Sequence, residues 1–201
     1  MDPLHGNKSK HLRLVISSWP NLVSLMRLLS VPLLVWLILM NYMQAAFITA
    51  TIAGLSDIVD GFMARALKAS TTVGAYLDPL ADKVLLIGLY LTLGYKTMIP
   101  VWLVILIVFR DLFILGGVLL LTVLGKTFPV RPIMSSKLNT FLQIVFVAWI
   151  LGDAAFGITI PWINLTMLYS VALTTIYSGG AYVFIGLNHL AEPSNSQPST
   201  S

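Results

Sequence analysis

The sequence has 201 residues, of which 57% are hydrophobic and only 10% are charged, and its net charge is +4. A soluble domain carries about 25% charged residues, so this composition excludes an ordinary water-soluble protein and indicates an integral membrane protein. The absence of cysteine excludes disulfides and thiolate metal sites.

Six apolar stretches are long enough to cross a bilayer. In chain order they cover residues 22–40, 45–64, 73–95, 100–124, 138–151 and 163–187, and the fifth is short enough that its helix could begin before Lys137. Backbone groups inside lipid must satisfy each other, so these stretches are predicted to be helices. The expected fold is an all-α integral membrane protein with six transmembrane helices.

The segments on either side of these helices are polar. Residues 1–20 form a basic arm, in which residues 10–19 mix basic and apolar side chains and either lie in the membrane interface or are disordered. Residues 21–190 form one six-helix domain, and residues 191–201 form a Ser/Pro-rich tail that is expected to be disordered.

Basic residues favour alternate connections between the apolar stretches. The second connection holds Arg65 and Lys68, and the fourth holds Lys126, Arg131 and Lys137, whereas the intervening connections carry little positive charge. The positive-inside rule then places both termini and these two connections in the cytoplasm. We expect a multi-pass protein of the bacterial inner membrane or an equivalent membrane.

Four aspartates lie in the second and third apolar stretches, where a carboxylate is costly and usually marks a functional site. Asp57 and Asp60 are three residues apart, and Asp78 and Asp82 are four apart, so each pair shares one face of its helix. The connection between the two stretches is short. We therefore expect both pairs to converge at the cytoplasmic ends of neighbouring helices.

Carboxylates gathered in this way repel each other unless a cation neutralises them, and oxygen ligands favour magnesium, manganese or calcium. Gly61 and Ala64 allow a helix or a ligand to approach the backbone, and Gly74 leaves room for a nucleotide. Arg65 presents a fork of donors suited to phosphate, with topology-setting charge as the alternative, which is the better interpretation of Lys68. The residues predict a divalent-metal site beside a phosphate site.

These residues complete a pattern with the spacing Asp57-x2-Asp60-Gly61-x2-Ala64-Arg65-x8-Gly74-x3-Asp78-x3-Asp82. The pattern resembles the signature of the CDP-alcohol phosphotransferase family at every defining position. The resemblance implies that Asp57, Asp60 and Asp78 ligate two divalent ions, Mg²⁺ or Mn²⁺, and that Asp82 shares one ion and acts as general base. It also implies nucleotide binding by Gly61, Ala64, Arg65 and Gly74, a homodimer, and no nucleic-acid partner.

The family resemblance implies transfer of a phosphatidyl group from CDP-diacylglycerol to an alcohol, with release of CMP. Asp78-Pro79-Leu80-Ala81-Asp82-Lys83 and the opening Pro20-Asn21-Leu22…Arg27 resemble the branch that makes phosphatidylglycerophosphate and cardiolipin. The acceptor is then phosphatidylglycerol or, alternatively, glycerol 3-phosphate. Asn139, where the glycerophosphate enzymes are expected to carry lysine, removes one positive charge and favours phosphatidylglycerol.

A second polar set is the candidate acceptor site, and it consists of Arg110, Arg131, Ser136 and Lys137. An ion pair within one helix between Arg110 and Asp111 is an equally good interpretation of the first of these residues. From another functional class, a divalent-cation channel or transporter also places carboxylates in a membrane. A channel would spread its acidic residues through the bilayer depth, whereas these aspartates gather at one face.

Overall fold

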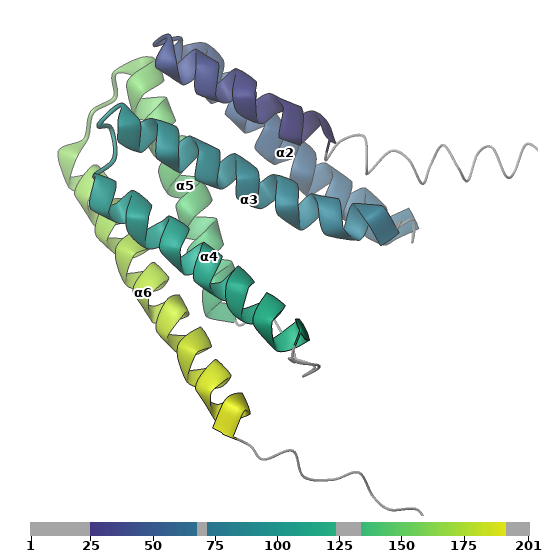
Figure 1. The fold of residues 1–201 in the computed structure, drawn as a ribbon. Helices are drawn as coiled ribbons and strands as arrows, with labels where there is room; N and C mark the ends of the chain where they lie inside the picture. The colour runs from purple at the N-terminus through teal and green to yellow at the C-terminus, as the bar shows by residue number, and fades with distance from the viewer. Residues whose placement is uncertain (1–24, 68–71, 124–133, 192–201) are drawn as a thin grey trace, which may run out of the picture. The chain divides into compact units, whose positions relative to one another are not determined.

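The computed structural model describes the backbone of residues 25–67, 72–123 and 134–191, and the side chains of residues 25–56, 81–117 and 134–185. These residues form helices and contain no strand (Figure 1). The helices are Leu25–Leu39, α2 (Met43–Leu67), α3 (Thr72–Tyr95), α4 (Val101–Val123), α5 (Met134–Phe156) and α6 (Pro161–Ala191). The all-α prediction is confirmed here. The arm 1–20 lies outside the described residues, as does the predicted tail 191–201 except for Ala191, which ends α6.

Several helices extend beyond the apolar stretches from which they were predicted. Arg65 lies within α2 rather than in the connection that follows it, and Lys137 lies in the first turn of α5, as the shortness of the fifth stretch allowed. Asp153 lies in the last turn of α5. The backbone hydrogen-bond ladder continues through polar residues where a helix leaves an apolar environment, so hydropathy alone predicts helices that are too short.

Three helices end in a residue with a left-handed backbone, which allows the next helix to begin within a few residues. Asn41 has φ 63° and Thr97 has φ 58°. After each, the following amide bonds to a carbonyl five residues back: Tyr42 N–H donates to Leu37 O at 2.9 Å and Met98 N–H to Leu93 O at 3.0 Å. These are Schellman caps. Gly157, with φ 68°, ends α5 in the simpler way, its amide donating to Asp153 O at 2.8 Å.

The chain divides into two compact units. The first comprises Met1–Val101 and Val147–Ile160, and the second comprises Trp102–Phe146 and Pro161–Ser201, so α5 contributes to both. Fully buried apolar side chains mark the core of each unit. They are Leu34, Ile38, Tyr90 and Leu93 in the first unit, and Ile107, Phe146 and Val171 in the second.

In the first unit, the helix Leu25–Leu39 packs in parallel on α3. Val31 lies against Gly88, where an added Cβ would meet the valine Cγ1 at 2.9 Å. The end of α5 packs on α2, because the Phe47 ring covers Gly152 and meets the Phe156 ring edge-on at 5.4 Å. Only residues 68–71 separate α2 from α3, and the two helices meet at one end of the unit (Figure 1).

Within the described residues, two helices are long and apolar enough to cross a bilayer, Met134–Phe156 and Pro161–Ile185, and Leu25–Leu39 and Met43–Ser56 are shorter apolar helices. Trp102 and Trp162 are exposed in the first turns of α4 and α6, as predicted for aromatic side chains at helix ends. Trp19 lies outside the described residues.

Candidate active site

The aspartate motif lies on α2 and α3. Asp57 and Asp60 are three residues apart in continuous α2, and Asp78 and Asp82 are four apart in α3, so each pair of positions shares a helix face, as predicted. Nucleotide-site candidates Gly61, Ala64 and Arg65 follow on α2, and Gly74 is in the first turn of α3.

The convergence of the four carboxylates remains a prediction. The side chains of Asp57, Asp60 and Asp78 lie outside the described residues, as do those of the four nucleotide-site candidates. Among the side chains that are described, no group of three or more histidine or acidic residues could hold a metal ion. Asp82 is thus the member of the motif whose surroundings the structure shows.

Asp82 forms an ion pair with Arg27, whose Nη1 donates to Oδ1 of the carboxylate. The arginine side chain is 4% exposed and that of the aspartate is 44% exposed. The guanidinium is therefore enclosed by protein, whereas the carboxylate lies at the edge of the unit, where a substrate could reach it. A charge-assisted bond of this kind fixes the carboxylate and partly neutralises it.

Parallel packing of the two helices brings Arg27 to Asp82. The pairs Arg27–Asp82 and Val31–Gly88 follow each other along the same contact, 55 and 57 residues apart in sequence. One turn after Arg27, the Ser30 hydroxyl donates a hydrogen bond to Arg27 O at 2.6 Å, so it needs no partner on the neighbouring helix. The sequence signal for this pair was an arginine inside an apolar stretch, which needs a counter-charge.

A buried polar cluster in the second unit contains two of the predicted acceptor residues. Arg110 on α4 donates from Nη1 to Asp111 Oδ1 at 2.7 Å and from Nη2 to Ser136 Oγ on α5 at 2.8 Å. Nη2 also donates to Ser178 Oγ on α6. The Tyr182 ring lies 5.9 Å from the guanidinium carbon. Arg110 thus forms the ion pair expected within its helix and also joins three helices.

Some buried polar atoms in this unit have no hydrogen-bond partner among the described residues, including Arg110 Nε, Ser135 Oγ and Asn139 Nδ2. The oxygen of the Asn139 amide is well satisfied, because Thr174 and Thr175 each donate a hydroxyl to it at 2.9 Å. Ser135 and Asn139 are one helical turn apart on α5. A negatively charged group could accept hydrogen bonds from such donors and from the guanidinium of the same cluster.

The remaining acceptor candidates are not part of this cluster as described. Lys137 is exposed, and Arg131 lies outside the described residues. Sequence reasoning missed Ser178, Thr174 and Thr175, which bring α6 to the cluster. Their signal was the three- and four-residue spacing of small hydroxyl residues on an otherwise apolar helix.

Comparisons with known proteins place these elements in a family. A family model of the CDP-alcohol phosphatidyltransferases matches residues 17–176, which include the aspartate motif and the polar cluster up to Thr175. The match favours the enzyme over the cation channel that intramembrane carboxylates alone also allowed.

Several curated relatives are about one-third identical to this chain. A cardiolipin synthase (CMP-forming) of Rattus norvegicus is 35% identical over 184 residues, covering 83% of this chain and 61% of the relative. The chloroplastic CDP-diacylglycerol–glycerol-3-phosphate 3-phosphatidyltransferase 1 of Oryza sativa is 35% identical over 195 residues, 88% of this chain and 58% of the relative. A CDP-diacylglycerol–glycerol-3-phosphate 3-phosphatidyltransferase of Bacillus subtilis is 35% identical over 140 residues, 69% of this chain and 71% of the relative.

The chain therefore spans about three fifths of the length of the rat and rice relatives and more of the bacterial one. The matched region holds every position of the aspartate motif. From the extent of the family match and the identity to the bacterial relative, the chain belongs to the CDP-alcohol phosphatidyltransferase family.

Proposed function

We propose that this protein is a membrane phosphatidyltransferase that uses CDP-diacylglycerol as donor and a glycerol-type alcohol as acceptor and releases CMP. The observation that carries the proposal is the complete aspartate motif, with its pairs at helical spacing on α2 and α3, inside the matched family region. The family is membrane-associated. The six helices would each cross the bilayer, with both termini and the aspartates at the cytoplasmic side.

The site would hold two divalent ions. Members of this family generally use divalent metal ions, and the carboxylates Asp57, Asp60, Asp78 and Asp82 are the hard oxygen donors that Mg²⁺ or Mn²⁺ prefers. Bound ions supply Lewis-acid polarisation of the pyrophosphate. Gly61, Ala64, Arg65 and Gly74 would bind the cytidine diphosphate portion, with Arg65 providing the positive fork.

The chain's own residues would carry the proton transfer. Asp82 accepts the proton of the acceptor hydroxyl, whose oxygen attacks the phosphorus that bears the diacylglycerol. A new O–P bond forms as the P–O bond to CMP breaks, and CMP leaves with the bonding electron pair. Arg27 holds one oxygen of Asp82 in place during this step.

The acceptor is proposed to be phosphatidylglycerol, with glycerol 3-phosphate as the alternative. The relatives include enzymes named for both reactions. Support for phosphatidylglycerol comes from Asn139, which is fully buried and uncharged beside the Arg110 cluster. One guanidinium, already paired with Asp111, suits the single charge of a phosphodiester better than the nearly double charge of a phosphomonoester.

The proposal is tested by measuring CMP release and lipid products with purified protein, CDP-diacylglycerol and Mg²⁺ or Mn²⁺. Phosphatidylglycerol and glycerol 3-phosphate are supplied separately as acceptors. We expect metal-dependent formation of cardiolipin. Strict dependence on glycerol 3-phosphate would overturn the choice of acceptor, and no CMP release with either acceptor would overturn the function.

Asp82→Asn should abolish turnover while leaving the fold intact, because the amide cannot accept the hydroxyl proton. Asp153→Asn is the matched control: Asp153 accepts a bond from Thr159 Oγ1 at 2.9 Å at the end of α5 and has no proposed role in the reaction. Circular dichroism and thermal unfolding check the folding of both variants. Near-normal activity in Asp82→Asn would remove the proposed base.

A further inference from the structure

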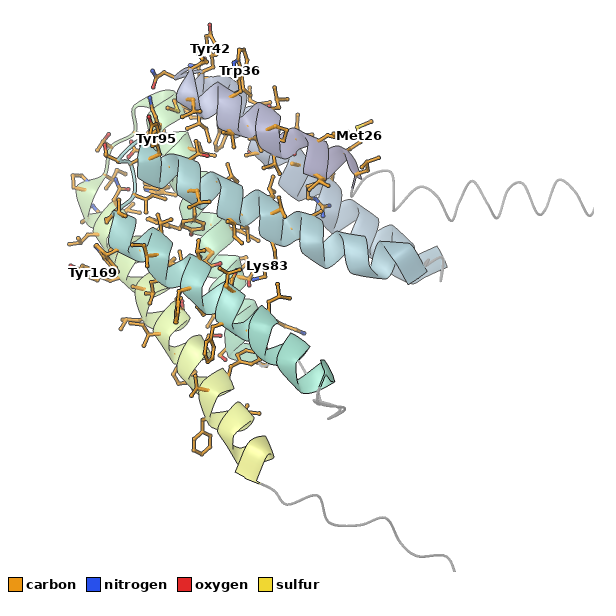
Figure 2. All side chains as sticks on the ribbon, in the orientation of Figure 1. Met26, Trp36, Tyr42, Lys83, Tyr95 and Tyr169 are labelled. Atoms are coloured by element: carbon orange, nitrogen blue, oxygen red, sulfur yellow. The ribbon has the colours of Figure 1, made fainter. Side chains whose placement is uncertain are left out.

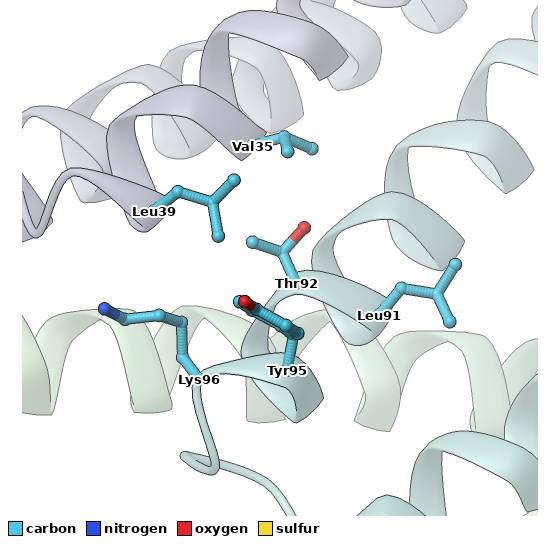
Figure 3. Close-up of a pocket in the computed structure, with 6 residues that line it drawn as sticks. All are labelled: Val35, Leu39, Leu91, Thr92, Tyr95 and Lys96. Atoms are coloured by element: carbon cyan, nitrogen blue, oxygen red, sulfur yellow. The ribbon is translucent and has the colours of Figure 1, made fainter.

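A groove of about 670 Å³ lies between the helix Leu25–Leu39 and the end of α3, in the first unit. Val35 and Leu39 line it from the first helix, and Leu91, Thr92, Tyr95 and Lys96 line it from α3 and the residue after it (Figure 3). No part of the proposed transfer reaction uses this groove, so its chemistry needs another explanation.

The lining of the groove is mainly apolar, and its polar groups belong to Thr92, Tyr95 and Lys96. Thr92 is buried and donates its hydroxyl to Gly88 O at 2.7 Å, so it presents little polarity to a ligand. Lys96 is partly exposed at the rim, and within the described part of the chain no carboxylate lies at ion-pair distance from it. The groove thus combines an apolar surface with one positive charge that lacks a counter-ion there.

The groove lies at the end of the unit where exposed aromatic side chains gather. Trp36, Tyr42 and Tyr95 are 51%, 57% and 78% exposed, and Figure 2 shows all three at the end opposite Met26. The Trp36 and Tyr42 rings are 6.0 Å apart. Exposed tryptophan and tyrosine at one level of a membrane protein mark the lipid–water interface.

The same geometry separates the groove from the proposed active site. Asp82 and Lys96 lie fourteen residues apart along and just beyond α3, which corresponds to about 21 Å of helix at about 1.5 Å per residue. In a bilayer with a hydrocarbon core of about 30 Å, positions so far apart along one crossing helix face different leaflets. A lipid in the groove would therefore be distinct from the donor and acceptor lipids.

We propose that the groove binds an anionic phospholipid, with an acyl chain on Val35, Leu39 and Leu91 and the phosphate paired with Lys96. The positive charge decides the class of lipid. A zwitterionic lipid brings its own cation next to its phosphate, so it gains less from Lys96 than an anionic lipid does. The inference rests on the proposed membrane embedding and is independent of the transfer reaction.

The absence of cysteine allows a site-specific test in the full chain. Leu91→Cys, at the groove, and Ile52→Cys, on the exposed face of α2, are each labelled with a bimane fluorophore in lipid nanodiscs. Phosphatidylglycerol or phosphatidylcholine with brominated acyl chains is then titrated in at equal mole fractions. Quenching reports which lipid occupies the surface beside each label.

At position 91 we expect phosphatidylglycerol to bind about fivefold more tightly than phosphatidylcholine, which corresponds to about 1 kcal/mol for one cation near an anionic lipid. At position 52 the two lipids should quench equally. Adding Lys96→Gln should abolish the preference at position 91, and Lys96→Arg should retain it. Transferase activity of Lys96→Gln should equal that of the unsubstituted protein.

Equal quenching at position 91, or a preference that persists in Lys96→Gln, would overturn the proposal. A third outcome is that both lipids quench the label at position 52 and neither quenches the label at position 91. This would show that protein, such as a second copy of this chain, covers the groove, and it would also overturn the proposal. Failure of the transfer assay leaves the quenching result unaffected, so the two proposals fail separately.

Discussion

Arg27 and Asp82 show how much of a site a sequence motif leaves unspecified. The spacing of the aspartates on two helices follows from the motif and from helical periodicity alone, and the structure has both pairs of positions on continuous helices. The partner of Asp82 lies 55 residues away. No spacing rule links positions on different helices. The sequence therefore shows that Arg27 needs a counter-charge, but it does not show that Asp82 supplies it.

Replacing Arg27 tests whether it positions Asp82. Arg27→Gln should lower kcat at least tenfold and change the KM for CDP-diacylglycerol little, because the carboxylate loses the charged donor that orients it but the nucleotide site is untouched. Arg27→Lys keeps the charge and should recover part of kcat. Steady-state kinetics measure both values. Equal losses of kcat in the two variants, with unchanged thermal stability, would contradict a role that depends on charge.

The polar residues of the second unit were predicted in part. Arg110 and Ser136 were assigned to one site from their positions in the sequence, and the structure joins them with a hydrogen bond of 2.8 Å. The contribution of α6 was not foreseen, since Thr174, Thr175 and Ser178 are common residues whose role depends on which helix they face. Their partners, Asn139 and Arg110, identify that role.

At the level of helices, the contact between Leu25–Leu39 and α3 depends on Gly88. A leucine there should push the first helix away, because even a Cβ would lie 2.9 Å from Val31 Cγ1, and valine has little rotamer freedom in a helix. We expect Gly88→Leu to lower the unfolding temperature and also kcat, since Arg27 lies one turn before Val31 on the displaced helix.

Gly54→Leu on α2 is the matched control, because nothing lies within 4 Å of a Cβ built there. Leucine favours helix over glycine by nearly 1 kcal/mol, so this variant should be neutral or more stable. Combining Val31→Ala with Gly88→Leu should restore part of the lost stability. If Gly88→Leu unfolded at the same temperature as Gly54→Leu, the close packing of the two helices would be wrong.

Arg110 connects α4, α5 and α6, so its loss should affect both stability and acceptor binding. Arg110→Ala leaves the buried Asp111 carboxylate without this partner and should cost about 3–5 kcal/mol of unfolding free energy. Ser178→Ala removes one hydrogen bond and should cost about 0.5–1.5 kcal/mol. Denaturant titration in detergent micelles measures both losses.

Kinetics separate a purely structural Arg110 from one that binds the acceptor. If Arg110 Nε, which has no partner among the described residues, and neighbouring donors bind the acceptor phosphate, Arg110→Lys should raise the KM for the acceptor and leave the KM for CDP-diacylglycerol unchanged. Ser178→Ala is the control for a small change in packing. A proportional rise in both KM values would mean that Arg110 acts only by holding the helices together.

At the scale of the whole molecule, the helices in the described residues follow the apolar stretches in order, because long apolar segments have few alternatives to a helix in lipid. Their ends were less accurate, since α2 continues to Leu67 and α5 runs on to Phe156, whereas the start of α5 before Lys137 had been allowed for. The left-handed backbone of Thr97 could not be foreseen, since β-branched residues rarely adopt it, whereas Asn41 is of a type that adopts it more readily. The distribution of basic residues also predicts which connections face the cytoplasm, and this orientation remains a prediction.

Single cysteines introduced into this cysteine-free chain test that orientation directly. Ser70→Cys and Ser196→Cys lie in segments predicted to be cytoplasmic, whereas Lys96→Cys and Ile158→Cys lie in connections predicted to face the opposite side. In intact cells, a membrane-impermeant maleimide should label the cysteines at 96 and 158 and spare those at 70 and 196. Detergent should then make all four cysteines reactive, which separates cysteines buried in the protein from cysteines protected by the membrane.

Labelling of position 70 in intact cells would put the aspartate ends of α2 and α3 on the outer side, away from a cytoplasmic nucleotide donor. Labelling of only one member of either pair would mean that the chain crosses the membrane a different number of times.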